Sequence, residues 1–145
     1  MLKEILNPED CARCKFCCSF RRQSLWEVPD KIKEYDWESE YKTDDPYEEV
    51  PCPYLVDGEG CQLDASEKPF ECKIWPYRIM KMPTCLSNDS ESKLVLAYSK
   101  SCPAFQKLDK EVIVNFGKKI MDTVTAEAVI DPSIIKEFDE GYEVI

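Results

Sequence analysis

Four cysteines stand within eight residues near the start of the chain, in the run CARCKFCC: Cys11, Cys14, Cys17 and Cys18. Thiols this dense indicate a ligand, and a metal centre bound by thiolates is the first interpretation. The chain has no histidine, and its five other thiols are Cys52, Cys61, Cys72, Cys85 and Cys102. A soft-metal site must therefore be built from sulfur, which favours iron–sulfur or zinc chemistry over imidazole-based catalysis.

The spacing Cys-x2-Cys-x2-Cys lets a short loop wrap one face of a four-iron cluster, with each thiolate on one iron. The fourth ligand of such clusters often comes from a distant Cys-Pro pair, and Cys52-Pro53 and Cys102-Pro103 both qualify. Zinc is the alternative, because two sites of four thiolates can be assembled from eight of the nine cysteines. If residues 11–18 were helical, three of their thiols could instead be small apolar residues of a core.

Cys17 and Cys18 are adjacent, and neighbouring side chains point in different directions. One metal centre can seldom take both without straining the backbone between them. We therefore expect two metal centres less than about 15 Å apart, with Cys17 bound to one and Cys18 to the other. The second centre has either four thiolate ligands or a looser ligand set with an open position.

Length and composition fit one domain with a modest core, since the chain has 145 residues of which 43% are hydrophobic. No stretch stays apolar for the roughly 18 residues of a membrane span, and the start MLKEILNPED lacks a signal-like apolar run. We expect a cytoplasmic protein with reduced thiols. A secreted disulfide scaffold is the competing interpretation, which the odd cysteine count disfavours.

The net charge of −10 disfavours electrostatic binding to nucleic acid or to an anionic membrane surface. Acidic residues concentrate between Glu27 and Glu49, whereas residues 11–22 contain four basic residues and no acidic one. Nearby cations lower the pKa of thiols and offset the negative charge of a thiolate centre. This charge pattern is consistent with a metal site at the cysteine run.

The elements that must position the thiols are short in the first half of the chain. We expect a short helix beginning near Asp30, an exposed connection over residues 38–51, and a tight hairpin that presents Cys52 and Cys61 across a glycine turn. Strand-like runs at Tyr77–Met82 and Lys93–Tyr98 predict an antiparallel pair joined by a polar loop that contains Cys85.

The last part of the chain has helical periodicity, with apolar residues three and four positions apart from Phe105 to Val124. We expect this stripe to pack against the core, with docking to a partner as the alternative. Asp131-Pro132-Ser133 then resets the chain before a final short amphipathic turn that carries Ile134, Ile135 and Phe138.

Several motifs in fixed order carry a family resemblance: CARCKFCC, then CPYL, then GCQLDASEKPFECKIWP, then SCP. Over residues 11–103 the chain resembles the YkgJ-type cysteine-cluster family, described as a zinc- or iron-chelating domain. The resemblance leaves Cys85 as an extra thiol and implies eight chelating cysteines: Cys11, Cys14, Cys17, Cys18, Cys52, Cys61, Cys72 and Cys102.

Two departures limit what the resemblance implies about activity. Relatives tend to have Arg-Pro where this chain has Lys68-Pro69, which keeps the charge but loses the bidentate fork of arginine. The family also resembles the cysteine-rich part of flagellin lysine methylases, which are longer, and this chain shows no glycine-rich nucleotide-binding turn.

Together these observations predict one α+β domain over residues 1–145, small, irregular and stabilised by metal, with a short antiparallel strand pair and a C-terminal helix. Its metal-binding part is residues 11–103 and its helical part is residues 104–145. The function that we expect is to hold a four-iron, four-sulfur cluster for electron transfer or redox-coupled chemistry with a protein partner. The alternatives are a zinc-binding interaction module, and a metal-dependent enzyme or maturation factor related to lysine N-methylases.

Overall fold

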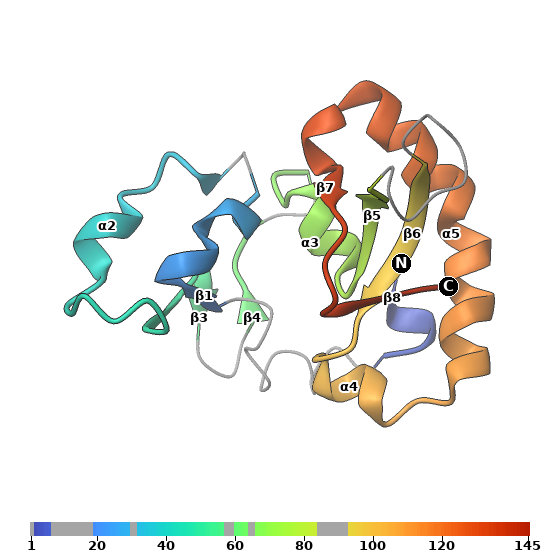
Figure 1. The fold of residues 1–145 in the computed structure, drawn as a ribbon, viewed down its shortest axis with the longest axis horizontal. Helices are drawn as coiled ribbons and strands as arrows, with labels where there is room; N and C mark the ends of the chain where they lie inside the picture. The colour runs from blue at the N-terminus through green and yellow to red at the C-terminus, as the bar shows by residue number, and fades with distance from the viewer. Residues whose placement is uncertain (1, 7–18, 30–31, 57–59, 64–65, 84–92) are drawn as a thin grey trace. The chain divides into compact units, whose positions relative to one another are not determined.

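The computed structural model describes residues 2–6, 19–29, 32–56, 60–63, 66–83 and 93–145 (Figure 1). The chain forms two compact units, an N-terminal unit, Leu2–Lys73, and a C-terminal unit, Ile74–Ile145. The boundary between them falls inside residues 11–103, the range predicted to bind metal. None of the helices in the described ranges has the length and apolar character needed to cross a membrane.

The N-terminal unit consists of short elements. Its described strands and helices are η1 (Leu2–Glu4), β1 (Ser19–Arg21), η3 (Arg22–Glu27), α2 (Trp37–Glu40), β2 (Glu49–Pro51), β3 (Leu55–Val56), β4 (Gly60–Cys61) and α3 (Phe70–Ile74), which ends at the unit boundary. The strands form two antiparallel pairs, β1 with β2 and β3 with β4. The second pair corresponds to the predicted hairpin, whose turn at 57–59 lies outside the described residues.

A small core holds the N-terminal unit together. Its buried members are Val28, Ile32, Trp37, Tyr41 and Val50, with Phe20, Leu25 and Cys52 packed against them. The Trp37 ring packs edge-to-face on Phe20, with ring centroids 5.4 Å apart, and its indole N–H donates to the Ile32 carbonyl. The Tyr41 hydroxyl donates to the Phe20 carbonyl at 2.7 Å. Both buried polar side chains are therefore satisfied by backbone carbonyls, as burial requires.

The helix expected near Asp30 can be followed only from Ile32, which has 3-10 conformation. Residues 30–31 lie outside the described residues, and the α-helix that follows, α2, starts only at Trp37. The Asp36 carboxylate accepts the Ser39 backbone N–H at 3.3 Å, and this cap fixes where the helix begins. The prediction overlooked Asp36 as an N-cap.

The acidic connection that follows α2 is mostly exposed, as expected, and Glu48 organises it. The Glu48 carboxylate accepts the backbone N–H groups of Lys42 and Thr43 and the Thr43 hydroxyl, at 2.7–3.1 Å. These hydrogen bonds, first of all the one from the Lys42 backbone, hold the pKa of Glu48 below its ordinary value of 4.5. The connection closes just before β2, the strand that leads to Cys52.

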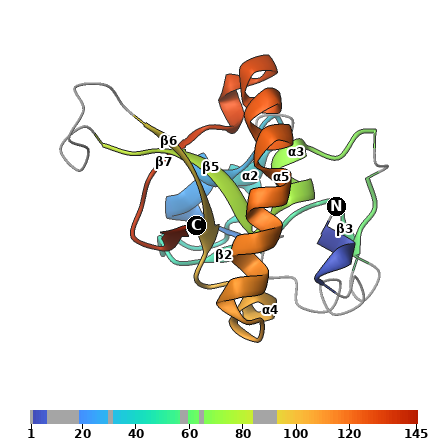
Figure 2. The ribbon, with the colours of Figure 1, turned by 90° about the vertical axis from the view of Figure 1, so that its right-hand side faces the viewer.

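The C-terminal unit is built on a four-stranded sheet in the order β7-β5-β6-β8, of which β5, β6 and β7 are labelled in Figure 2. Its elements are β5 (Tyr77–Lys81), β6 (Leu94–Ser99), α4 (Pro103–Gln106), α5 (Lys110–Ile130), η6 (Pro132–Ile134), β7 (Lys136–Glu137) and β8 (Tyr142–Val144). The antiparallel pair β5–β6 confirms the predicted strand pair, and β8 extends it in the antiparallel sense. β7 adds a short parallel edge beside β5.

The long helix α5 covers one face of this sheet, which confirms the predicted C-terminal helix (Figure 1). Tyr77 lies fully buried between the two layers, against the rings of Phe105 and Phe116, and its hydroxyl donates to the Ile113 carbonyl of α5. At Gly117 a β-carbon would lie 3.1 Å from the Tyr77 ring and 2.7 Å from Ile145. Glycine there allows this close approach of helix and sheet.

The final amphipathic turn expected at residues 134–138 is instead a 3-10 turn followed by a strand. The Asp131 carboxylate accepts the Ser133 N–H, which starts η6, and the chain then enters β7. The Phe138 N–H donates to the Lys81 carbonyl at 3.1 Å. Pairing with β5, a partner far away in the sequence, therefore decides the conformation of this segment.

Replacing Phe116 by alanine is expected to destabilise the C-terminal unit by about 3–5 kcal/mol, because a large buried ring leaves a cavity against Tyr77. The measurement is urea unfolding followed by helical circular dichroism. The matched control is Val129→Ala, at a helix position that is 79% exposed and where we expect a change within about 0.5 kcal/mol. Equal effects of the two changes would contradict the packing of α5.

Replacing Glu48 by glutamine is expected to destabilise the protein at pH 7 and to have a vanishing effect in acid. A carboxylate whose folded-state pKa is lowered contributes stability above its unfolded pKa, and loses it as the pH falls through the folded value. The difference in unfolding free energy between wild type and Glu48→Gln should therefore shrink below about pH 4.5. Glu34→Gln, at an exposed position, is the control, and a pH-independent difference would contradict this role.

Candidate metal centre

The structure describes four of the eight predicted ligands: Cys52, Cys61, Cys72 and Cys102. The run with Cys11, Cys14, Cys17 and Cys18 lies outside the described residues, as does Cys85. Cysteines that are at least partly buried suit the donor set of an iron–sulfur or zinc centre. Within the described ranges, no three cysteine, aspartate or glutamate side chains are grouped closely enough to hold a metal ion.

Cys52 and Cys61 flank the hairpin of the N-terminal unit. Cys52 follows β2 directly and packs against the small core, and its carbonyl accepts the Leu55 N–H at 3.0 Å. Cys61 ends β4, where it is paired with Leu55 of β3. Both thiols are half-buried. The predicted hairpin between Cys52 and Cys61 is therefore present, and in it Cys61 pairs with Leu55, three residues after Cys52.

Cys72 lies in the middle of α3, a helix of five residues. The helix begins at Phe70, directly after Pro69, whose carbonyl accepts the N–H groups of Cys72 and Lys73 at 3.0 and 3.2 Å. Pro69 is buried and Lys68 is half-buried, and the hydrogen bonds to the Pro69 carbonyl anchor the start of this helix. The Cys72 thiol is half-buried, next to a Glu71 side chain that is only 5% exposed.

Cys102 belongs to the C-terminal unit and is 8% exposed. It stands at the N-cap of α4 with extended backbone, followed by Pro103 in the first turn, and its carbonyl accepts the Gln106 N–H at 3.0 Å. Proline at this place suits a helix start, because it lacks the N–H that would be left over there. The Cys-Pro pair is thus a fixed helix entry with a buried thiol.

Two of the four cations predicted to surround the cysteine run are neutralised by acidic residues. Arg21 pairs with Glu49 at 3.2 Å, and Arg22 pairs with Glu38 at 3.0 Å. The guanidinium of Arg22 also lies 4.8 Å from the centre of the Tyr41 ring. Acidic residues therefore neutralise two of the cations that we expect near the cysteine run.

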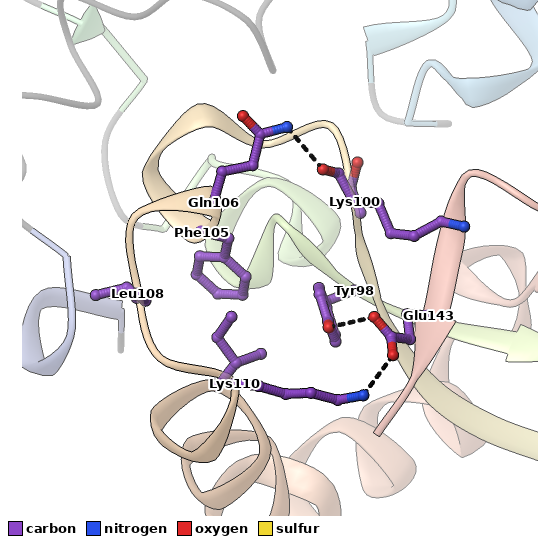
Figure 3. A pocket seen from close by; sticks show the side chains of 9 residues that line it. Tyr98, Lys100, Phe105, Gln106, Leu108, Lys110 and Glu143 are labelled. Atoms are coloured by element: carbon purple, nitrogen blue, oxygen red, sulfur yellow. Dashed lines mark hydrogen bonds and ion pairs between the residues drawn. The ribbon is translucent and has the colours of Figure 1, made fainter.

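A cavity of about 250 Å³ opens in the C-terminal unit among β6, β8, α4 and the start of α5 (Figure 3). Its lining residues are Tyr98, Ser99, Lys100, Phe105, Gln106, Leu108, Lys110, Ile113 and Glu143. The Tyr98 hydroxyl donates to Glu143 at 2.6 Å, and the other carboxylate oxygen of Glu143 pairs with the Lys110 ammonium.

Electrostatic interactions connect Tyr98, Glu143 and Lys110 in the wall of this cavity. Burial, and then the Glu143 hydrogen bond, raise the pKa of Tyr98 to about 12, so the phenol stays protonated. The Lys110 hydrogen bond, and then that of Tyr98, lower the pKa of Glu143, so its carboxylate stays ionised. Tyrosine, glutamate and lysine thus satisfy one another, and we interpret the group as a link among β6, β8 and α5.

Sequence reasoning missed Arg78, a buried arginine in the C-terminal unit that is 4% exposed. Its signal was present, because Arg78 stands inside the apolar run YRIM that forms β5. Charged residues are almost never fully buried without a partner, so a charge in such a strand merits attention. Comparisons of the chain with protein-family models, with curated proteins and with solved structures found no match.

In metal-free native protein, the Cys102 thiol is expected to react with iodoacetamide at least several-fold more slowly than the Cys61 thiol. Cys102 is nearly buried at the start of α4, whereas Cys61 is half-buried at the end of a two-residue strand, and reagent access follows exposure. Pulse alkylation with mass spectrometry of the peptides measures both rates in one sample. Equal rates in the native protein, as in urea, would contradict the placement of Cys102.

Proposed function

We propose that this protein binds metal through cysteine thiolates and holds at least one four-iron, four-sulfur cluster. The sequence supports this with three cysteines at the two-residue spacing of such clusters and two Cys-Pro pairs for the remaining position. All four described cysteines are at least partly buried, which is compatible with ligands that the fold holds in place. The resemblance to the YkgJ-type family supports the same class of function.

The observation that carries the proposal is the cysteine spacing, and the burial among the described residues of the two units is consistent with it. Among the described residues, sixteen buried hydrophobic side chains lie in the C-terminal unit and five in the N-terminal unit. Seven of the eight predicted ligands belong to the N-terminal unit: Cys11, Cys14, Cys17, Cys18, Cys52, Cys61 and Cys72. Small units with little core usually need a disulfide or a metal, and these thiols would supply the metal.

The residues divide into two ligand groups in this proposal. Cys11, Cys14 and Cys17 would bind three irons of one cluster, with Cys52 or Cys102 on the fourth. Cys18 would join the remaining thiols in a second centre. When bound, such a cluster supplies one-electron exchange with a protein partner. The protein's own contribution is to fix the thiolates on short elements and to exclude water with the core beneath Cys52.

Zinc is the second candidate, and the hairpin is the observation that favours it. Structural zinc sites commonly use two cysteines presented by a tight turn together with remote ligands. Cys52 and Cys61 flank β3–β4 in that manner. In this case the metal would serve folding and partner binding, without electron transfer.

Anaerobic purification followed by metal and acid-labile sulfide analysis distinguishes the two candidates. We expect brown protein that contains iron and sulfide in similar amounts. Colourless protein with stoichiometric zinc would replace the iron–sulfur proposal by the zinc proposal. Protein with neither metal after anaerobic purification would contradict both.

Replacing Cys14 by serine is expected to remove metal and to lower the unfolding temperature of the N-terminal unit, because the loop of residues 11–18 forms the nucleus of the proposed site. Cys85→Ser is the matched control, since Cys85 stands outside the matched motifs and should retain all metal. Metal content per chain and thermal unfolding are measured on both variants. Unchanged metal in Cys14→Ser, or equal loss in Cys85→Ser, would show that the ligands are wrongly assigned.

A further inference from the structure

Arg78 lies inside β5 on the sheet face opposite α5. Strand side chains alternate, so the neighbours Tyr77 and Ile79 face the helix while Arg78 shares its face with Met80. The guanidinium lies 4.7 Å from the centre of the Trp75 ring and 5.7 Å from that of the Tyr142 ring. These two rings are themselves in edge-to-face contact, with centroids 6.1 Å apart. Arg78 is therefore enclosed by aromatic walls and is 4% exposed.

Two donors in this cluster are buried and lack an acceptor within the part of the chain that the structure describes. Among those residues, neither the NH1 group of Arg78 nor the indole N–H of Trp75 has a hydrogen-bond partner. The ion pairs that the structure gives for arginine, Arg21 with Glu49 and Arg22 with Glu38, do not involve Arg78. Arginine keeps its proton in proteins, so Arg78 cannot reduce the cost of burial by becoming neutral. Contact with aromatic rings compensates only part of that cost.

We infer that Arg78 and Trp75 form a binding site for an anion that accepts hydrogen bonds from both. The guanidinium supplies the charge, and the indole supplies a neutral donor whose ring also contacts the guanidinium. The aromatic walls exclude water, which strengthens the attraction between the cation and the bound anion. Phosphate and carboxylate groups fit the planar donor pattern of arginine.

The anion that we expect at this site is a small oxyanion from solution, for which inorganic phosphate is the probe. This inference does not depend on the proposed metal binding. An experiment on both metal-loaded and metal-stripped protein therefore separates this inference from the proposed function.

The test follows the indole N–H signals in ¹H–¹⁵N spectra while inorganic phosphate is added at constant ionic strength. The chain has three tryptophans, and the Trp75 signal is assigned by its loss in Trp75→Phe. Trp37 is the internal control, because its indole already donates to the Ile32 carbonyl at 3.1 Å. We expect a saturable shift of the Trp75 signal with an unmoved Trp37 signal, together with a rise in unfolding temperature that equal chloride does not give.

Arg78→Met keeps the length of the side chain and removes its charge, and it should abolish the response. Arg78→Lys keeps the charge without the fork and should weaken phosphate binding at least roughly tenfold. Because Arg78→Met could fail to fold, Trp75→Phe is the second variant, with weaker phosphate stabilisation expected. Arg21→Met, at an exposed arginine, is the control that should respond as the wild type does.

A phosphate response in the purified protein assigns the site to a solute oxyanion, whatever metal the protein contains. A Trp75 signal that changes on metal removal but not on addition of phosphate would overturn the inference. Absence of any Trp75 response in both metal-loaded and metal-stripped protein would overturn the inference. So would a phosphate response that Arg78→Met retains.

Discussion

Burial of apolar side chains is the constraint on which each unit depends, and the two units meet it differently. In the C-terminal unit one buried ring, Tyr77, joins the sheet to α5 and is surrounded by Phe105 and Phe116. A glycine at position 117 allows the helix to lie directly on that ring. The apolar stripe of α5 packs against one face of the sheet, which is the usual arrangement of a helix on a sheet. The unit can therefore be stable through packing alone.

Among its described residues, the N-terminal unit has a small buried core surrounded by local polar contacts. The Glu48 carboxylate closes one loop, the Asp36 carboxylate caps α2, and two arginines pair with acidic residues. Exposed ion pairs contribute little to stability, and a helix cap contributes about 1 kcal/mol. Contacts of this kind fix the paths of loops better than they hold a unit folded. Cross-linking by metal thiolates, as proposed, would add what these contacts lack and would account for the concentration of cysteines in this part of the sequence.

The elements that the sequence predicted are those whose signals are local. The periodicity of α5 and the two apolar runs of β5 and β6 each span enough residues to identify themselves. β7 has two residues and β8 has three, and β7 carries only Lys136 and Glu137, so no pattern marks it. Such strands exist because β5 and β6 offer backbone partners. A pairing between segments distant in the chain is invisible to local propensity.

In the candidate sites, too, some features are visible in the sequence and others arise only when the chain folds. Cysteine identities and spacings are properties of the sequence, and the resemblance to the YkgJ-type family implies which eight of the nine are the proposed ligands. The position of Arg78 against Trp75, and the lack of an acceptor for either donor among the described residues, arise only when β5 and the segment preceding it fold together. Sequence analysis could note a charge in an apolar strand, but burial of that charge is a tertiary property.

The balance of charge bears on both the proposed thiolate centre and Arg78. A centre with four thiolates remains an anion, because the thiolates outnumber the charge of a zinc ion, and the chain already has a net charge of −10. Of the described arginines, Arg21 and Arg22 face carboxylates and are partly exposed, so water and acidic residues already balance them. Arg78 is the buried one, and the described residues around it supply rings instead of an ion pair. In a chain this acidic, a buried arginine walled by aromatic rings leaves its cation available for an anion from elsewhere.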